Sequence, residues 1–156
     1  MIQKSILYRL FRVGSIPRKL RPILANEGIV LSDEGMSGWF ITRHVKGPGK
    51  RYMHRREGFS GCLVITKKRI LCYTFWKRQI NISVDDPRLS KLYTDVTDQH
   101  KLSVAFESSV FRDEWEGIIE YRFKTDKAIQ FQDALTSLGV QKGFPKGTDQ
   151  KVIHDR

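Results

Sequence analysis

The stretch GFSGCLVITKKRILCYTFW, residues 58–76, places the strongest constraint on the fold. Two short apolar runs, CLVI and ILCY, flank the polar residues TKKR, and this pattern is typical of a β-hairpin with Lys67 and Lys68 near its tip. If Ile65 pairs with Ile70, successive side chains alternate between the two faces of the sheet. One face then consists of Leu63, Ile65, Ile70 and Cys72, and the other of Cys62, Val64, Leu71 and Tyr73.

Both faces of this hairpin are therefore apolar, although an antiparallel sheet with one face in water has only one apolar face. A cover for the second face is available in the segment IQKSILYRLF, whose apolar residues recur at helical spacing while its basic residues lie off that stripe. Burial of each large apolar side chain contributes about 1.5 to 3 kcal/mol. The stripe consists of Ile2, Ile6, Leu7, Leu10 and Phe11.

We expect this basic amphipathic helix to dock on the second face of the sheet. Two alternatives stay open: a second copy of the chain covers that face, or the helix lies in the headgroup layer of a membrane. If the helix meets a membrane or a partner, its contact residues are Ile6, Leu7, Arg9, Leu10, Phe11 and Arg12.

The rest of the chain reads as strands followed by one helix. A second short helix is expected around Leu24, strained by Pro22 and stopped near Gly28. Further strands are predicted at residues 28–32, 38–45, 51–59, 77–84, 100–108 and 117–124, with turns at 33–37 and 46–50 and a loop or irregular turn at 88–99. A closing helix is predicted from an N-cap at Thr125 or Asp126 to Gly139, with an apolar face formed by Ala128, Phe131, Leu135 and Leu138.

About seven short strands and a closing amphipathic helix predict a mainly β (α+β) fold, an antiparallel sandwich or partly open barrel with the helix at one end. The 156 residues suffice for one domain with a single core. We expect a basic helical extension at residues 1–26, the β domain at 27–140 and a loose tail at 141–156.

The segment FSGCLVITKKRILCY, from Phe59 to Tyr73, resembles the Gly-x-Leu-x-(Val/Ile)-Thr-x-x-Arg-(Ile/Leu) hairpin of GRAM-like and bacterial pleckstrin-homology-like domains. The likeness runs loosely from Gly28 to Gly139 and includes the ending EYRFKTDKAIQFQDAL. It implies a PH-like order of strands followed by a capping helix. The N-terminal helical segment and the stretch from Arg88 to Gln99 depart from the family pattern.

The positive charge is concentrated in the first half of the chain. The net charge is +11, and residues 1–78 hold 17 Lys and Arg against 4 Asp and Glu, a net of +13. Such a charge favours an anionic membrane surface, a phosphorylated headgroup or nucleic acid. If the turn at 46–50 and the hairpin tip converge on one rim, they resemble the inositol phosphate sites of PH-like domains. The residues of that predicted rim are Arg43, Lys46, Lys50, Arg51, Arg55, Arg56, Lys67, Lys68 and Arg69.

Other features restrict location and chemistry. Cys62 and Cys72 are expected on opposite faces of the hairpin as buried thiols in a reducing compartment, so no disulfide is predicted. The chain lacks an apolar run of the roughly 20 residues that cross a bilayer, and we therefore expect a cytoplasmic protein that can associate peripherally with a membrane. The acid-free N-terminus also fits a mitochondrial transit peptide.

Catalysis and metal binding find little support, because HExxH, Gly-x-Ser-x-Gly and Cys/His ligand patterns are lacking. We therefore expect no cofactor. The favoured function is a non-catalytic PH-like module that binds anionic lipids, a membrane surface or a protein partner. The first alternative is a structural module for protein contacts or homo-oligomerisation. Non-specific nucleic-acid binding ranks third, since the aromatic residues among the positive charges lie mostly in strand patterns.

Overall fold

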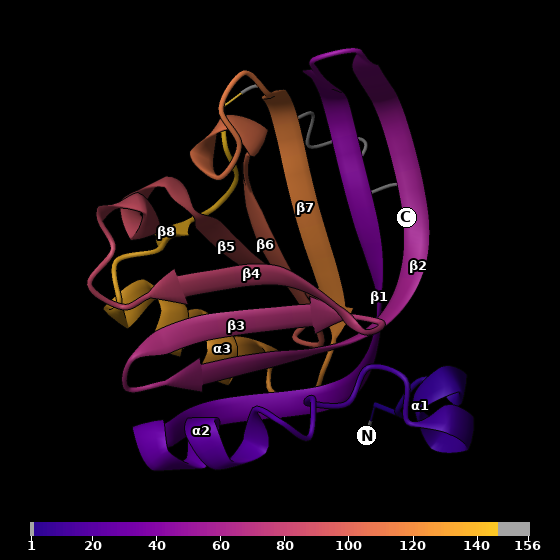
Figure 1. Cartoon of the computed structure of the whole chain (residues 1–156), viewed down its shortest axis with the longest axis vertical. Coiled ribbons are helices and arrows are strands. Elements are labelled where there is room, and N and C mark those ends of the chain that lie inside the picture. Colours follow the sequence, from indigo (N-terminus) through magenta and orange to yellow (C-terminus); the bar gives the residue numbers. More distant parts are fainter. Residues whose placement is uncertain (1, 147–156) are drawn as a thin grey trace.

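The computed structural model describes residues 2–146. Their strands form one curled, mainly antiparallel sheet that resembles half a barrel (Figure 1). The strand order is β4-β3-β2-β1-β7-β6-β5-β8. The strands are β1 (Ile29–Gly47), β2 (Lys50–Thr66), β3 (Arg69–Thr74), β4 (Lys77–Ser83), β5 (Tyr93–Thr97), β6 (Lys101–Glu107), β7 (Glu116–Lys124) and β8 (Gln141–Lys142). The helices are α1 (Ile6–Phe11), α2 (Arg21–Glu27) and α3 (Ala128–Ser137), with 3₁₀ turns η1 (Pro87–Lys91) and η2 (Ser108–Val110).

The β2–β3 hairpin has the predicted register. Ile65 pairs with Ile70 and Leu63 with Cys72, while Cys62 pairs with Tyr73 and Val64 with Leu71. The face that carries Leu63 and Ile65 belongs to the main core inside the curl, which α3 completes with Phe131 and Leu135. Both cysteines are free and buried, and burial raises the pKa of the Cys62 thiol to about 12.

The cover of the second apolar face differs from the prediction. Cys62, Val64 and Leu71 pack against Ile16 and Leu24, so residues just before and within α2 cover the hairpin. The expected docking of the helix at residues 2–11 on this face was wrong, because α1 contributes no buried side chain. The physical reason is tethering: Gly28 alone separates α2 from β1, and β1 is the pairing partner of β2.

The residues 33–37, predicted as a turn, continue β1 through a bulge. Asp33 pairs with Leu63 and Met36 with Gly61, so the first strand has an extra residue at this point. Gly35 has a φ of +68°, a backbone conformation that glycine adopts without strain. Bulges bend a strand and increase its twist. The turn-forming composition therefore produces a bulge in β1 here, and the pairing of β1 with β2 continues on both sides of it.

The stretch 88–99, predicted as a loop or irregular turn, contains η1 and β5. β5 pairs antiparallel with β6, with Thr94 opposite Val104. The strand is short and mostly polar, so its alternation is weak in the sequence although Thr94 is fully buried. A loose tail was expected at residues 141–156. Of these, residues 147–156 lie outside the described part of the chain, while Gln141 and Lys142 form β8, which pairs in parallel with β5.

The closing helix is present where the sequence predicts it, and it packs against the core inside the curled sheet. Ala128, Phe131 and Leu135 are buried, and Gly139 follows the helix with a φ of +111°. The backbone N–H of Lys127 donates to Thr125 Oγ1 at 3.1 Å, so Thr125 supports the first turn from just outside the helix. The mainly β class and the partly open, curled sheet are confirmed, with eight strands where about seven were expected.

Candidate functional site

Helix α1 is attached to the protein by its polar side. Ser5 caps the helix by accepting from the N–H of Tyr8 at 3.0 Å, and Ser5 Oγ lies 2.6 Å from Ser60 Oγ. The Tyr8 ring packs on Gly35, where an added Cβ would lie 2.3 Å from the ring. Backbone bonds from Ser5 to Gly35 and from Gly35 to Gly14 fix the segment against β1. The orientation of α1 therefore follows from specific contacts to the sheet.

The apolar side of α1 is largely exposed to solvent. The exposed fractions are 63% for Ile6, 41% for Leu7, 69% for Leu10 and 68% for Phe11. A surface helix normally turns such a stripe toward the core. Here Tyr8 occupies the inward position and the stripe is left exposed to solvent.

Glu34 joins this segment to the fold. Its carboxylate accepts from Tyr8 Oη at 3.0 Å, from the N–H of Ile16 at 2.9 Å and from Arg21 Nη2 at 2.9 Å. Partial burial acts to raise the pKa of Glu34, but these three donors outweigh it and hold the pKa below its usual range. Glu34 is thus the common acceptor for α1, the following loop and α2.

We expect the Glu34→Ala variant to lose about 1 to 3 kcal/mol of unfolding free energy, because three donors lose their acceptor. Urea denaturation measures this loss, and trypsin should cleave the variant faster near Arg12. A matched control is Glu57→Ala, which removes a carboxylate that pairs with Arg55 at the surface. Equal stability of the two variants would contradict the role assigned to Glu34.

The stabilisation by Glu34 should also depend on pH. Because the pKa is lowered by folding, the contribution is complete above the ordinary glutamate pKa of about 4.3 and is lost as the pH falls through the lower folded value. The stability difference between the native chain and Glu34→Ala should therefore be largest near neutral pH and shrink in acid. A difference that stays constant down to the acid transition would argue against it.

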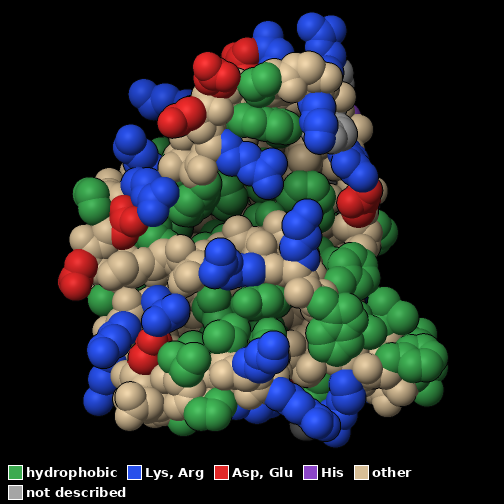
Figure 2. Space-filling model, viewed as in Figure 1, with side chains coloured by type: hydrophobic (Ala, Val, Ile, Leu, Met, Phe, Trp, Pro, Cys, Tyr) green, Lys and Arg blue, Asp and Glu red, His purple; other side chains and the backbone are tan. Residues whose placement is uncertain are grey.

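Exposed aromatic residues lie beside α1. Phe75 and Trp76, in the turn between β3 and β4, are 41% and 60% exposed, and Trp39 of β1 is 41% exposed. Phe11 and Trp76 line one depression, while Ile6, Trp39 and Phe75 line another. Figure 2 shows apolar side chains gathered at the lower right, over α1 and the adjoining turn. We define the apolar lobe as Ile6, Leu7, Leu10, Phe11, Trp39, Phe75 and Trp76.

Positive side chains border the apolar lobe. Arg12 lies 5.0 Å from the Tyr8 ring centroid, and Arg56 lies 4.1 Å from the Trp39 ring centroid. Arg9 and Arg18 line the same two depressions as the lobe and are exposed. All six predicted contact residues of the N-terminal helix are found here. Four belong to the apolar lobe, Ile6, Leu7, Leu10 and Phe11, and two lie beside it, Arg9 and Arg12.

The predicted rim of cations is not formed. Lys50 begins β2, whereas Lys67 and Lys68 follow its last residue, so the two groups lie at opposite ends of a 17-residue strand (Figure 1). At about 3.3 Å per residue, the path along β2 is roughly 50 Å. Lys46 pairs with Glu116 at 3.0 Å and Arg55 with Glu57, while Lys50, Arg51 and Arg56 are exposed.

Two residues of the predicted rim have other roles. Arg69 forms a salt bridge with Glu27, through Nε at 3.0 Å and through Nη2. Desolvation acts to raise the pKa of Glu27, yet the bonds from Arg69 and Thr66 hold it below its usual range. Arg43 is 4% exposed and lies 2.9 Å from Glu120 Oε1. Neither arginine is free for a surface anion.

Glu120 is the centre of a buried charge cluster that the sequence did not reveal. Its side chain is fully buried, and Oε2 accepts from Ser103 Oγ at 2.7 Å and from Arg122 Nε at 3.1 Å. With Arg43 on the other oxygen, two arginines surround one carboxylate. The sequence contains only one signal for this cluster, the alternation in GIIEYRFK. It places the Glu120 side chain on the other face of the strand from the inward-facing Ile119 and Tyr121.

Within residues 2–146, no group of three or more His, Cys, Asp or Glu side chains is placed to hold a metal ion. His44 and His54 lie with their ring centroids 4.8 Å apart. In the same part of the chain, none of the helices is both long and apolar enough to pass through a bilayer.

Comparison with protein-family models and with curated protein sequences gives no match for this chain.

Proposed function

We propose that this protein is a non-catalytic module that binds the anionic surface of a membrane, with the apolar lobe entering the headgroup layer. The observation that carries the proposal is the orientation of α1: contacts to the sheet fix its polar side and direct Ile6, Leu10 and Phe11 into solvent. A large exposed apolar patch on a folded protein marks an interaction surface.

The charges around the lobe favour a membrane over a neutral partner. Arg9, Arg12, Arg18 and Arg56 border the apolar residues, and each cation near an anionic bilayer contributes about 1 kcal/mol. Trp39 and Trp76 belong to the residue type that is enriched at the membrane interface. Apolar side chains next to a basic border are the features of peripheral membrane binding.

We also propose membership of the PH-like or GRAM-like superfamily. The order of the elements supports it, because seven strands precede a helix that completes the core, as the resemblance of Phe59 to Tyr73 implies. The proposed membrane contact differs from the rim expected from that resemblance, since it uses the N-terminal addition and the β3–β4 turn. In this proposal, the exposed cations at the two ends of β2 make only a secondary contribution to the electrostatic attraction to the membrane.

The test is cosedimentation of the full chain with vesicles of phosphatidylcholine, with and without phosphatidylserine. We expect binding that requires phosphatidylserine, weakens with salt and falls at least about tenfold in an Arg9→Glu, Arg56→Glu variant. The matched control is Lys67→Glu, Lys68→Glu, which makes the same charge change at the distant hairpin tip. Salt-insensitive binding, or an equal loss in both variants, would count against the proposal.

Self-association is the competing outcome. Sedimentation velocity over a range of concentrations, without lipid, separates the two possibilities. A monomer that binds vesicles supports the proposal. A lobe-dependent dimer that ignores vesicles would replace it by a contact between copies of the chain.

A further inference from the structure

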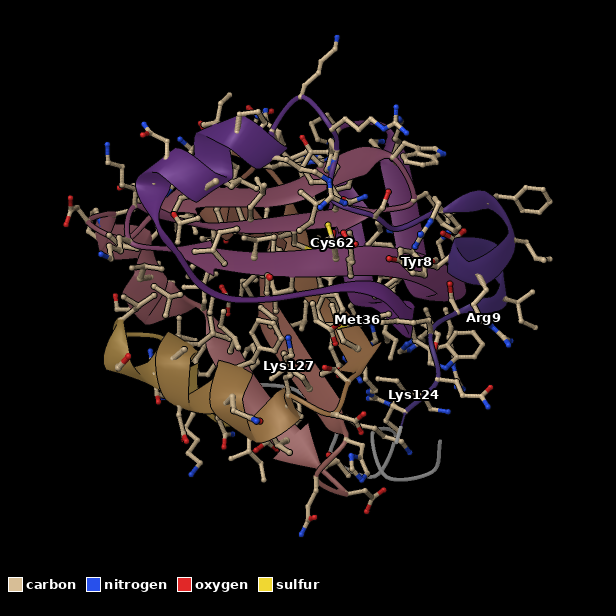
Figure 3. All side chains as sticks on the ribbon, turned by 90° about the horizontal axis from the view of Figure 1, so that it is seen from below. Tyr8, Arg9, Met36, Cys62, Lys124 and Lys127 are labelled. Atoms are coloured by element: carbon tan, nitrogen blue, oxygen red, sulfur yellow. The ribbon has the colours of Figure 1, made fainter. Side chains whose placement is uncertain are left out.

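A groove of about 810 Å³ lies between the N-terminal segment and the sheet. It has the volume of pockets that bind small molecules, which measure about 300 to 1,000 Å³. Figure 3 shows two of its lining residues, Arg9 on α1 and Lys124 at the end of β7. Ile6 and Leu7 line it from the helix, while Trp39 and Phe75 line it from the sheet.

The charge of this groove has one sign. Six cationic residues line it, and neither Asp nor Glu occurs among its described lining residues. Three of these cations are already paired: Lys4 with Asp33, Arg122 with Glu120 and Lys101 with Asp98. Arg9 and Lys124, in contrast, make no ion pair with any carboxylate within residues 2–146. The complete set of cations is Lys4, Arg9, Arg56, Lys101, Arg122 and Lys124.

The apolar part of the groove adjoins this charge. Trp39 carries Arg56 over its ring, and the exposed sides of Leu7 and Phe75 complete an apolar wall. Gly58 of β2 lies opposite Trp39 and adds no side chain, so the groove stays open there. A ligand that matches both parts has an acyl chain and an anionic head.

We propose that this groove binds one molecule of an anionic acyl amphiphile, with the head on Arg9 and Lys124 and the chain against Leu7, Trp39 and Phe75. Charge complementarity selects an anionic head over a neutral one, because the exposed Arg9 and Lys124 have no carboxylate partner within residues 2–146. The inference extends the proposed function from contact with a surface to capture of a single molecule. It does not require a bilayer.

The test is calorimetric titration of the full chain with dilute, non-micellar amphiphiles. One arm uses oleate, a carboxylate, and another uses oleoyl lysophosphatidic acid, a phosphate with the same chain. Monooleoylglycerol removes the charge, and inorganic phosphate removes the chain. We expect saturable binding of one molecule per chain in at least one anionic arm. No saturable binding in either of those arms, or equal binding of monooleoylglycerol, would overturn the inference.

Two variants locate the ligand. Gly58→Leu places a side chain in the groove without strain. A Cβ atom added to Gly58 would have its nearest contact, 3.7 Å, with Trp39, and the φ angle of Gly58 is not in the positive range. Lys124→Glu reverses an exposed charge at the head position. Each should weaken binding at least tenfold, whereas Lys142→Glu on β8 should not. Unchanged thermal unfolding shows that the variants fold, and unchanged binding in both would place the ligand elsewhere.

The outcomes separate this inference from the proposed function. Gly58→Leu leaves Leu10, Phe11 and Trp76 untouched, so its vesicle binding should persist while its binding of single amphiphiles is lost. A native chain that binds vesicles but no single amphiphile overturns the groove alone. A native chain that binds oleate but no vesicles supports the groove and overturns the membrane proposal.

Discussion

The Glu120→Ala variant is expected to lose about 3 to 5 kcal/mol of unfolding free energy, because it leaves Arg43 and Arg122 buried without a carboxylate. Arg43 is 4% exposed and Arg122 is 8% exposed, so water cannot easily replace the lost partner. Ser103 Oγ also loses its acceptor. The measurement is urea denaturation at neutral pH, with a circular dichroism spectrum to show that the variant is folded before denaturant is added.

A matched control lies on the same strand. Glu116 pairs with Lys46, but both side chains are at least half exposed. Exposed pairs contribute at most about 1 kcal/mol, so Glu116→Ala should change the stability little. A similar loss of unfolding free energy in Glu116→Ala and Glu120→Ala would show that the cluster around Glu120 does not stabilise the protein more than an exposed ion pair does. If Glu120→Ala does not fold, Glu120→Gln, which retains an acceptor for Ser103, should give a smaller measurable loss.

Replacing both Leu10 and Phe11 with aspartate is expected to reduce the affinity for phosphatidylserine vesicles by at least about 100-fold. Transfer of each side chain from water into the headgroup layer contributes about 1.5 to 3 kcal/mol, and 1.4 kcal/mol corresponds to a factor of ten. New negative charges at the anionic surface add to the loss. Vesicle titrations with the native chain and the variant give the ratio directly.

The same variant should fold as the native chain does. Leu10 and Phe11 are 69% and 68% exposed, and surface changes of this kind usually alter stability by less than about 0.5 kcal/mol. Ile129→Asp is the control, since Ile129 is also an exposed apolar residue, 47% exposed, but lies on α3. A large loss of stability would mean that the stripe packs inside the protein. Undiminished vesicle binding would remove the lobe from the membrane contact.

Several local features could be predicted from the sequence. The register of the β2–β3 hairpin follows from the alternation around Lys67 and Lys68, because pairing across a short turn involves only neighbouring residues. The inward face of α3 follows from helical spacing in the same way. The bulge at Gly35 could not be recognised, since it forms only against the distant strand β2. The strand β5 was missed because it is short and mostly polar, so its alternation is weak.

The candidate site was predicted only in part. The amphipathic character of residues 6–11 was clear, but the side on which that helix is attached depends on Tyr8, Ser5 and Glu34, which are spread over 30 residues. The groove could not be foreseen either, because it joins the N-terminal segment to the middle of β1 and β2 and to the end of β7. Side chains that meet only through the curvature of the sheet leave no periodic signal.

By itself, the sequence determined which faces are apolar, where the closing helix lies and which half of the chain is positive, because these properties depend on residues close along the chain. The tertiary structure alone decided which segment covers the second face of the hairpin, that the cations at the two ends of β2 stay apart, and that the stripe of α1 faces solvent. The reason is physical: a link of one residue, Gly28, holds α2 beside β1, and the hydrogen bonds of Tyr8 and Ser5 hold α1 with its apolar side toward solvent.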